Sequence, residues 1–310
     1  MNKILIAIVV IIILAGIIIF GGFFSNNSND SNNMDSRSLK VAATIFPLCD
    51  IVKNIGGDNI DVKCILPPGA SPHYFEFTPK KIKELGGVMV VFSIGHGVDD
   101  WAADIAKTLG SAESFVATEV VDSGITLRKS TNEEEGLDDP HYWLNFNNAK
   151  IIVDNVERAL SGFDPSNEEK YQNNALEYKA KLDSQEQESK DVLSSLANRN
   201  IVTLHDAWYY FADNFNLNII GTFEPSAGEE PSPQYLAQLR KAVMDNEVKI
   251  IFSEPQLSSV GIQSLVEDLS LGVANLDPLG GVTGRESFLE LMSYNVHSVF
   301  DALNANSGDK

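Results

Sequence analysis

A stretch near the middle of the chain, Ser166–Ala197, contains neither glycine nor proline and predicts one uninterrupted helix of roughly eight turns. Asp164-Pro165 supplies the start signal, and two glutamates occupy the first turn. Apolar residues recur along the helix at alternating spacings of four and three, but Gln185 and Ser189 give this stripe a polar centre. Apolar ends with a polar centre suit a helix that packs on two different bodies. An ordinary amphipathic surface helix with a weak centre is the alternative.

Short apolar segments alternate with helical segments on both sides of this helix. We expect strands at Leu39–Ile45, Val62–Leu66, Val88–Ser93 and Ser114–Thr118 before it, and at Asn200–Leu204, Asn218–Phe223, Lys249–Ser253 and Val273–Leu276 after it. Repeated β-α alternation is typical of a parallel sheet with helices on its faces. The chain is also long enough for two compact bodies with their own cores. The pattern therefore predicts an α/β fold with two Rossmann-like lobes, each a parallel β-sheet flanked by helices, joined by one long rigid helix.

The N-terminus predicts a membrane anchor. Ile4–Phe24 is an uncharged apolar run that is long enough to span a bilayer. No clear small-x-small cleavage site follows it, and no cysteine lies close behind it to receive a lipid, so an uncleaved anchor is favoured over a removed signal peptide. The polar, low-complexity segment that follows suggests a flexible tether. We therefore expect an anchor at 1–24, a tether at 25–38, an N-terminal lobe at 39–163, a linking helix at 164–198 and a C-terminal lobe at 199–310.

The charge of the chain excludes one class of partner. Its 23 basic and 43 acidic residues leave a net charge of −20, whereas a nucleic-acid-binding surface needs the opposite sign. An acidic chain attracts cations, although most of these carboxylates also serve solubility.

The chain has two cysteines, Cys49 and Cys64. Export to an oxidising compartment permits a disulfide between them, while two buried free thiols are the alternative. Their spacing does not fit a thiolate metal site.

Four potential metal ligands fall just beyond strand ends, where parallel α/β sheets bind their ligands. His205 and Asp277 each directly follow an apolar run of the second half. His73 and His141 follow prolines in Ser-Pro-His and Asp-Pro-His, which restrict the backbone. Because each half contributes two of these residues, we expect them to meet between the lobes.

Three imidazoles and one carboxylate suit tetrahedral Zn²⁺, because manganese and magnesium prefer more oxygen ligands. Four protein ligands leave no position for an activated water, so the site is expected to hold the ion. A zinc hydrolase is disfavoured, since no His-Glu-x-x-His motif is present. Glu254 and Asp206 are candidates to orient a ligand histidine or to balance its charge, although Glu254 also fits a helix N-terminal carboxylate.

The two remaining histidines are weaker candidates. His96 also follows a strand, so its position alone does not exclude it as a ligand. His297 lies midway along the last predicted helix, where a structural role is expected.

Five segments that contain these residues resemble the signature segments of the metal-binding solute receptors of ABC importers, the zinc/manganese cluster. They are Pro72-His73-Tyr74-Phe75-Glu76-Phe77-Thr78-Pro79, Asp139-Pro140-His141-Tyr142-Trp143-Leu144, Leu204-His205-Asp206-Ala207-Trp208, Ser253-Glu254-Pro255-Gln256 and Leu276-Asp277-Pro278-Leu279-Gly280-Gly281. The resemblance covers about 40–303, keeps the family's order and includes the long linking helix. Phe77 and Asn145-Phe146 depart from the usual residues, but they lie outside the ligand set.

The resemblance implies a monomeric extracytoplasmic receptor, not an enzyme, that delivers a metal ion to a permease driven by an ATPase. The family's ligands match His73, His141, His205 and Asp277. In its manganese receptors the third position is typically a glutamate, so His205 resembles the zinc branch and indicates Zn²⁺ as the bound substrate. Mn²⁺ and Fe²⁺ stay possible, because some relatives that bind them have histidine at that position. A surface adhesion or metal-sequestering module is the alternative from a different class.

Overall fold

The computed structural model describes residues 38–110, 113–116, 124–129, 138–224 and 231–305. Contacts join the chain from Leu39 onward into one compact unit. Within the described residues, no helix is both long and apolar enough to span a membrane. The anchor predicted at Ile4–Phe24 and the tether after it lie outside the described residues.

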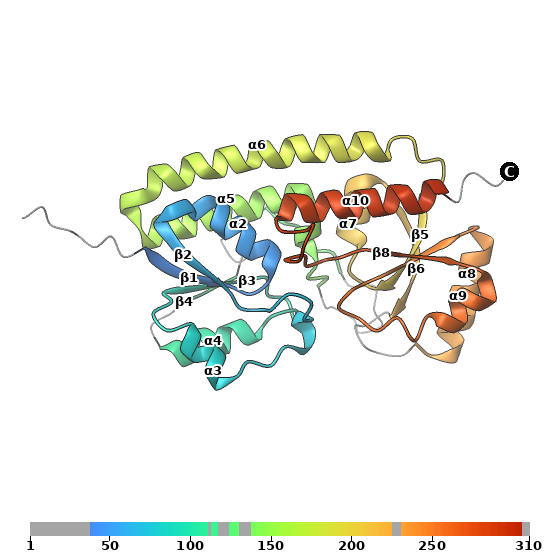
Figure 1. Cartoon of the computed structure of the whole chain (residues 1–310), viewed down its shortest axis with the longest axis horizontal. Coiled ribbons are helices and arrows are strands. Elements are labelled where there is room, and N and C mark those ends of the chain that lie inside the picture. Colours follow the sequence, from blue (N-terminus) through green and yellow to red (C-terminus); the bar gives the residue numbers. More distant parts are fainter. Residues whose placement is uncertain (1–37, 111–112, 117–123, 130–137, 225–230, 306–310) are drawn as a thin grey trace, which may run out of the picture. The chain divides into compact units, whose positions relative to one another are not determined.

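The first half of the chain forms a four-stranded parallel sheet with the strand order β2-β1-β3-β4 (Figure 1). Its strands are β1 (Leu39–Ala43), β2 (Ile60–Cys64), β3 (Val90–Ser93) and β4 (Glu113–Val116). Its helices are α2 (Phe46–Gly56), α3 (Pro79–Glu84), α4 (Trp101–Leu109) and α5 (Phe146–Phe163). A disulfide between Cys49 of α2 and Cys64 of β2 resolves the alternative that the sequence left open.

The second half forms another four-stranded parallel sheet, with the order β6-β5-β7-β8. Its strands are β5 (Asn200–His205), β6 (Asn218–Glu224), β7 (Ile250–Ser253) and β8 (Gly272–Asn275). Its helices are α7 (Tyr209–Phe215), α8 (Pro233–Asp245), α9 (Gln263–Leu269) and α10 (Phe288–Ala305). Two parallel sheets flanked by helices confirm the predicted α/β class.

The long helix between the sheets is α6 (Glu168–Leu193), preceded by a 3-10 turn at Pro165–Asn167. It contacts α2 and α5 from the first half and α10 from the second (Figure 1). Its polar centre is not a solvated face, because Glu186 and Ser189 are both buried. Lys150 of α5 pairs with Glu186 at 3.2 Å, so the polar centre matches a charge on a neighbouring helix.

Apolar residues of both sheets belong to one hydrophobic cluster, which includes Val41 of β1 and Ile201 of β5. A partly buried carboxylate links three helices beside this cluster. Asp50 of α2 accepts hydrogen bonds from the Tyr178 hydroxyl of α6 at 3.1 Å and from the backbone N–H of Phe288, the first residue of α10, at 3.0 Å. The carboxyl ends of the two sheets are thus held in one framework.

Candidate metal-binding site

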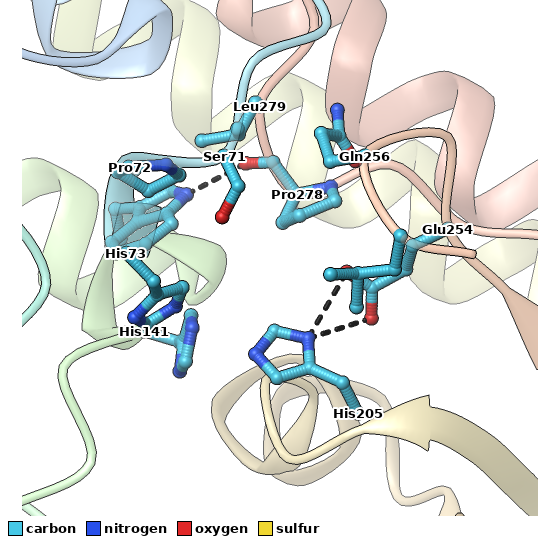
Figure 2. Close-up of a pocket in the computed structure, with 11 residues that line it drawn as sticks. Ser71, Pro72, His73, His141, His205, Glu254, Gln256, Pro278 and Leu279 are labelled. Atoms are coloured by element: carbon cyan, nitrogen blue, oxygen red, sulfur yellow. Dashed lines mark hydrogen bonds and ion pairs between the residues drawn. The ribbon is translucent and has the colours of Figure 1, made fainter. Parts of the chain in front are cut away.

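Three of the predicted ligands converge in the structure (Figure 2). His73 lies in the 3-10 turn Pro72–Tyr74 after β2, His141 precedes the turn Tyr142–Leu144, and His205 is the last residue of β5. One ring nitrogen of each lies within 4.8 Å of the others. Within the described part of the chain, these three residues form the group of histidine, cysteine or acidic side chains that could hold a metal ion.

His205 is oriented by Glu254, one of the two carboxylates predicted to do so. The Nδ1 atom of His205 lies 2.9 Å from Oε1 and 3.0 Å from Oε2 of Glu254 (Figure 2). The indole N–H of Trp208 donates to the same carboxylate at 2.8 Å. With its proton on Nδ1, the ring presents the lone pair of Nε2, which is buried and has no hydrogen-bond partner among the described residues. Such an orphaned acceptor fits a bound cation.

The charge around His205 also favours a cation. Burial disfavours the charged ring, but the Glu254 carboxylate beside it raises the pKa of His205 above its ordinary value. Asp206, the second predicted carboxylate, is 7% exposed and adds to this effect through its charge. A divalent ion benefits from the same two carboxylates.

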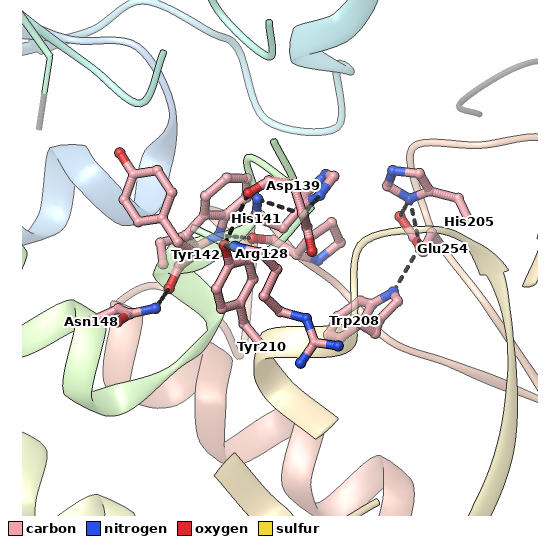
Figure 3. A network of polar contacts seen from close by, with 11 residues as sticks. Arg128, Asp139, His141, Tyr142, Asn148, His205, Trp208, Tyr210 and Glu254 are labelled. Carbon is pink, nitrogen blue, oxygen red and sulfur yellow. Dashed lines mark hydrogen bonds and ion pairs between the residues drawn. The ribbon is translucent and has the colours of Figure 1, made fainter. Parts of the chain in front are cut away.

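His141 is oriented by Asp139, which the sequence reasoning did not assign (Figure 3). Asp139 Oδ1 accepts from the backbone N–H of His141 at 3.0 Å and lies 2.9 Å from its Nδ1. The Tyr210 hydroxyl donates to the Asp139 carbonyl at 3.2 Å and accepts from the Arg128 backbone N–H at 2.8 Å. The Asp-Pro-His motif contains a signal for this contact, because an aspartate often accepts a hydrogen bond from the backbone N–H two residues later.

His73 has a different environment. Burial, followed by the neighbouring rings of His141 and His205, lowers the pKa of His73 to about 3. This imidazole is therefore neutral at physiological pH and has a lone pair available for a metal. The Trp101 indole holds the turn by donating to the Pro72 carbonyl at 3.1 Å.

A cavity surrounds the three rings, and most of its wall is apolar. The residues that line it are Ser71, Pro72, His73, His141, Trp143, His205, Glu254, Gln256, Leu257, Pro278 and Leu279. Three ligand nitrogens in a small apolar cavity can bind a dehydrated cation more strongly than the same groups could in water.

Asp277 lies beside the cavity, but its carboxylate is outside the group of three histidines. Its Oδ1 accepts from the side-chain N–H of Gln256 at 2.8 Å, and its Oδ2 lies 3.0 Å from Nη1 of Arg285. The next two residues, Pro278 and Leu279, line the cavity wall.

The two remaining histidines lie outside the cavity lining. His96 Nδ1 is 3.7 Å from Oδ2 of Asp138, and its ring packs edge-on against Tyr142. His297 is exposed on α10 and bonds through Nδ1 to the Ser293 carbonyl at 2.8 Å.

The chain resembles known proteins in sequence and in fold. The family model described as "Zinc-uptake complex component A periplasmic" matches residues 41–302. The manganese ABC transporter substrate-binding lipoprotein PsaA of Streptococcus mitis is 29% identical over 280 residues, which cover 86% of this chain and 90% of that protein.

Two solved structures show the same fold. The zinc-bound ZnuA with residues 138–173 deleted has a TM-score of 0.77 at 25% identity, covering 86% of this chain and 98% of that one. FpvC of Pseudomonas aeruginosa, solved with Mn²⁺, has a TM-score of 0.76 at 25% identity, covering 87% and 100%. Because the family match spans most of the chain and confirms the resemblance inferred from its motifs, this protein belongs to the zinc-uptake component A family and is a metal-binding substrate-binding protein of an ABC importer.

Proposed function

We propose that the protein captures Zn²⁺ with the imidazoles of His73, His141 and His205 and with the carboxylate of Asp277, and then delivers the ion to its importer. The convergence of three ring nitrogens, one of them buried without a partner, carries this proposal. The group contains no carboxylate, and imidazole ligands favour zinc over manganese. Asp277 would complete a tetrahedral set from a position beside the cavity.

Mn²⁺ is the second candidate, and Fe²⁺ is a third, because imidazole ligands also suit iron. The relative PsaA is named for manganese, and FpvC was solved with Mn²⁺. Mn²⁺ prefers oxygen ligands, and the three histidines provide only nitrogen. Asp277 and bound water would have to supply them, so the competition between the two metals decides the assignment.

We propose the carboxylates of Glu254 and Asp139 as the groups that fix the ligand histidines. Each lies 2.9 Å from the Nδ1 atom of its histidine, which directs Nε2 toward the ion. The charge of Asp206 also acts on His205.

The placement of the protein in its cell follows from the same role. We propose that 1–24 anchor it and 25–38 tether it, so that 39–163 and 199–310 act as two lobes on the extracytoplasmic side, linked by 164–198. Its partners would be the permease and the cytoplasmic ATPase of an ABC importer. Relatives such as PsaA are named as lipoproteins, which supports a membrane-attached receptor.

Elemental analysis and metal competition test the proposal on the full chain in detergent. We expect one Zn²⁺ per chain, displaced by Mn²⁺ only at large excess, and a strong loss of affinity in His205→Ala because water alone can fill the gap. Tighter binding of Mn²⁺ would overturn the zinc assignment. A chain that binds neither metal in stoichiometric amount would overturn the receptor role of the site.

A further inference from the structure

Arg285 binds the proposed fourth ligand. Its Nη1 lies 3.0 Å from Oδ2 of Asp277, with the two side chains 18% and 2% exposed. A tight turn brings the arginine back to this aspartate: the Gly281 N–H donates to the Arg285 carbonyl and the Arg285 N–H donates to the Val282 carbonyl, both at 2.9 Å. Gly284 at φ 81° allows this turn, because that backbone region disfavours other residues.

The remaining polar atoms of Asp277 are fixed in place. Its backbone N–H and C=O both bond to the side chain of Asn295, at 2.8 and 2.7 Å. Its Oδ1 accepts from the N–H groups of Leu279 and Gly280, at 2.9 and 3.1 Å, and from Gln256 at 2.8 Å. Oδ2 is therefore the carboxylate oxygen that can exchange its partner. Among the described residues, that partner is Arg285.

The guanidinium is held loosely enough to be exchanged. Nη1 is buried near Oδ2 but forms no hydrogen bond of normal geometry with any described residue. The guanidinium carbon also lies 4.4 Å from the centroid of the Tyr294 ring, which stabilises the cation independently of Asp277. Losing the carboxylate would leave Arg285 with this contact and with partial access to water.

We propose that Arg285 competes with the metal ion for Oδ2 of Asp277, so that metal binding exchanges a guanidinium for the divalent cation. Two cations close to one carboxylate oxygen repel each other, so the two bound states exclude one another. Arg285 then limits the affinity for the metal and promotes its release to the permease. This inference rests on the proposed role of Asp277 as the fourth ligand.

Zinc affinity and release rate in Arg285→Gln test the exchange, with the full chain and a chromophoric chelator as competitor. We expect binding about tenfold tighter, with a correspondingly slower release in stopped flow, because the competing ion pair with Asp277 is removed. Arg285→Lys keeps the charge and should stay close to the wild type. Arg240→Gln is the matched control, since it removes the same charge from the Arg240–Asp268 pair of α8 and α9, outside the cavity lining.

The Asp277→Asn background separates the possible failures. There, Arg285→Gln should change the affinity by less than about threefold, because the contested carboxylate is gone. Unchanged or weaker zinc binding in Arg285→Gln alone would overturn the exchange while leaving the receptor role intact. Unchanged binding in Asp277→Asn would overturn both the exchange and the fourth ligand, whereas a wild-type chain without zinc would overturn the proposed function itself.

If Arg285→Gln does not fold, a structure of the zinc-loaded wild type decides: the Nη1–Oδ2 separation should exceed roughly 4 Å, and an intact pair overturns the exchange.

Discussion

A buried carboxylate beside Nδ1 is the shared feature of two of the three histidines at the site. Glu254 orients His205 and Asp139 orients His141, each at 2.9 Å. Such a partner fixes the tautomer with Nε2 free and makes the ring a stronger electron donor. Among the described residues His73 has no such carboxylate, and it stays neutral because burial and its two neighbouring rings lower its pKa.

Replacing Glu254 by glutamine tests this orienting role. The amide keeps the shape of the side chain but lacks the negative charge, so we expect zinc affinity to fall about 10- to 100-fold. Chelator competition measures the change. Glu267→Gln removes the same charge from an exposed position of α9 and should bind as the wild type does. Equal affinities in the two variants would contradict the role assigned to Glu254.

Asp99 should make the stability of the metal-free protein depend on pH. Its carboxylate is fully buried and accepts from the Thr44 hydroxyl and from the N–H groups of Ile94 and Gly95, at 2.9 and 2.6 Å. Burial outweighs these bonds and raises the pKa of Asp99 from 3.8 to about 6. Because the folded pKa is above the unfolded one, this contribution is fully present below pH 3.8 and is lost as the pH rises through 6.

Denaturant unfolding of the wild type and of Asp99→Asn at pH 4 and at pH 7 measures this contribution. The free energy of unfolding of the wild type should fall by about 2 kcal/mol relative to the variant between these pH values, because part of the effect is already lost at pH 4. The two proteins share all other titrating groups, so an equal change in their free energies of unfolding between pH 4 and pH 7 would contradict the assignment to Asp99.

At the scale of elements, the sequence predicted every strand and the long helix, because apolar periodicity and glycine or proline breaks are local signals. The start of α7 depends on a tertiary contact: the helix begins at Tyr209, after a turn in which Trp208 donates to Glu254. The burial of Glu186 was also missed. Glu186 pairs with Lys190, only four residues away, and with Lys150, which lies 36 residues away, so only the tertiary structure reveals the second pair.

The site shows the same difference between local sequence signals and tertiary contacts. The histidines could be found from strand ends and motifs, which are features of the sequence itself. Arg285 could not, because its relation to Asp277 depends on the turn after β8. Sequence patterns locate the histidines more readily than the residues whose contacts depend on the tertiary fold.

The Cys49–Cys64 disulfide joins α2 to β2 across a separation of 15 residues. Replacing both cysteines by alanine should lower the free energy of unfolding by about 3 kcal/mol, because the unfolded chain regains the entropy of an open loop. Denaturant unfolding with and without reductant measures this. Reductant should destabilise the wild type and leave the double variant unchanged. A wild type insensitive to full reduction would contradict the stabilising role of the disulfide.

At the scale of the whole molecule, α6 and the shared core restrict how far the two sheets can move apart. The helix runs without a break from Glu168 to Leu193 and contacts helices of both halves. Asp50 adds a partly buried connection between α2, α6 and α10. A hinge would have to break these contacts together, so metal binding should act through loop ordering and small rotations.

Small-angle scattering of the metal-free and zinc-loaded chains tests this restriction. We expect the radius of gyration to change by less than about 1 Å, because no free hinge joins the two sheets within the described residues. His205→Ala with added zinc is the control for nonspecific effects of the metal. Replacing Asp50 by alanine removes the connection to Tyr178 and Phe288, so any compaction on loading should become larger in that variant. A large compaction of the wild type would show that α6 bends or detaches, which contradicts its role as a rigid link.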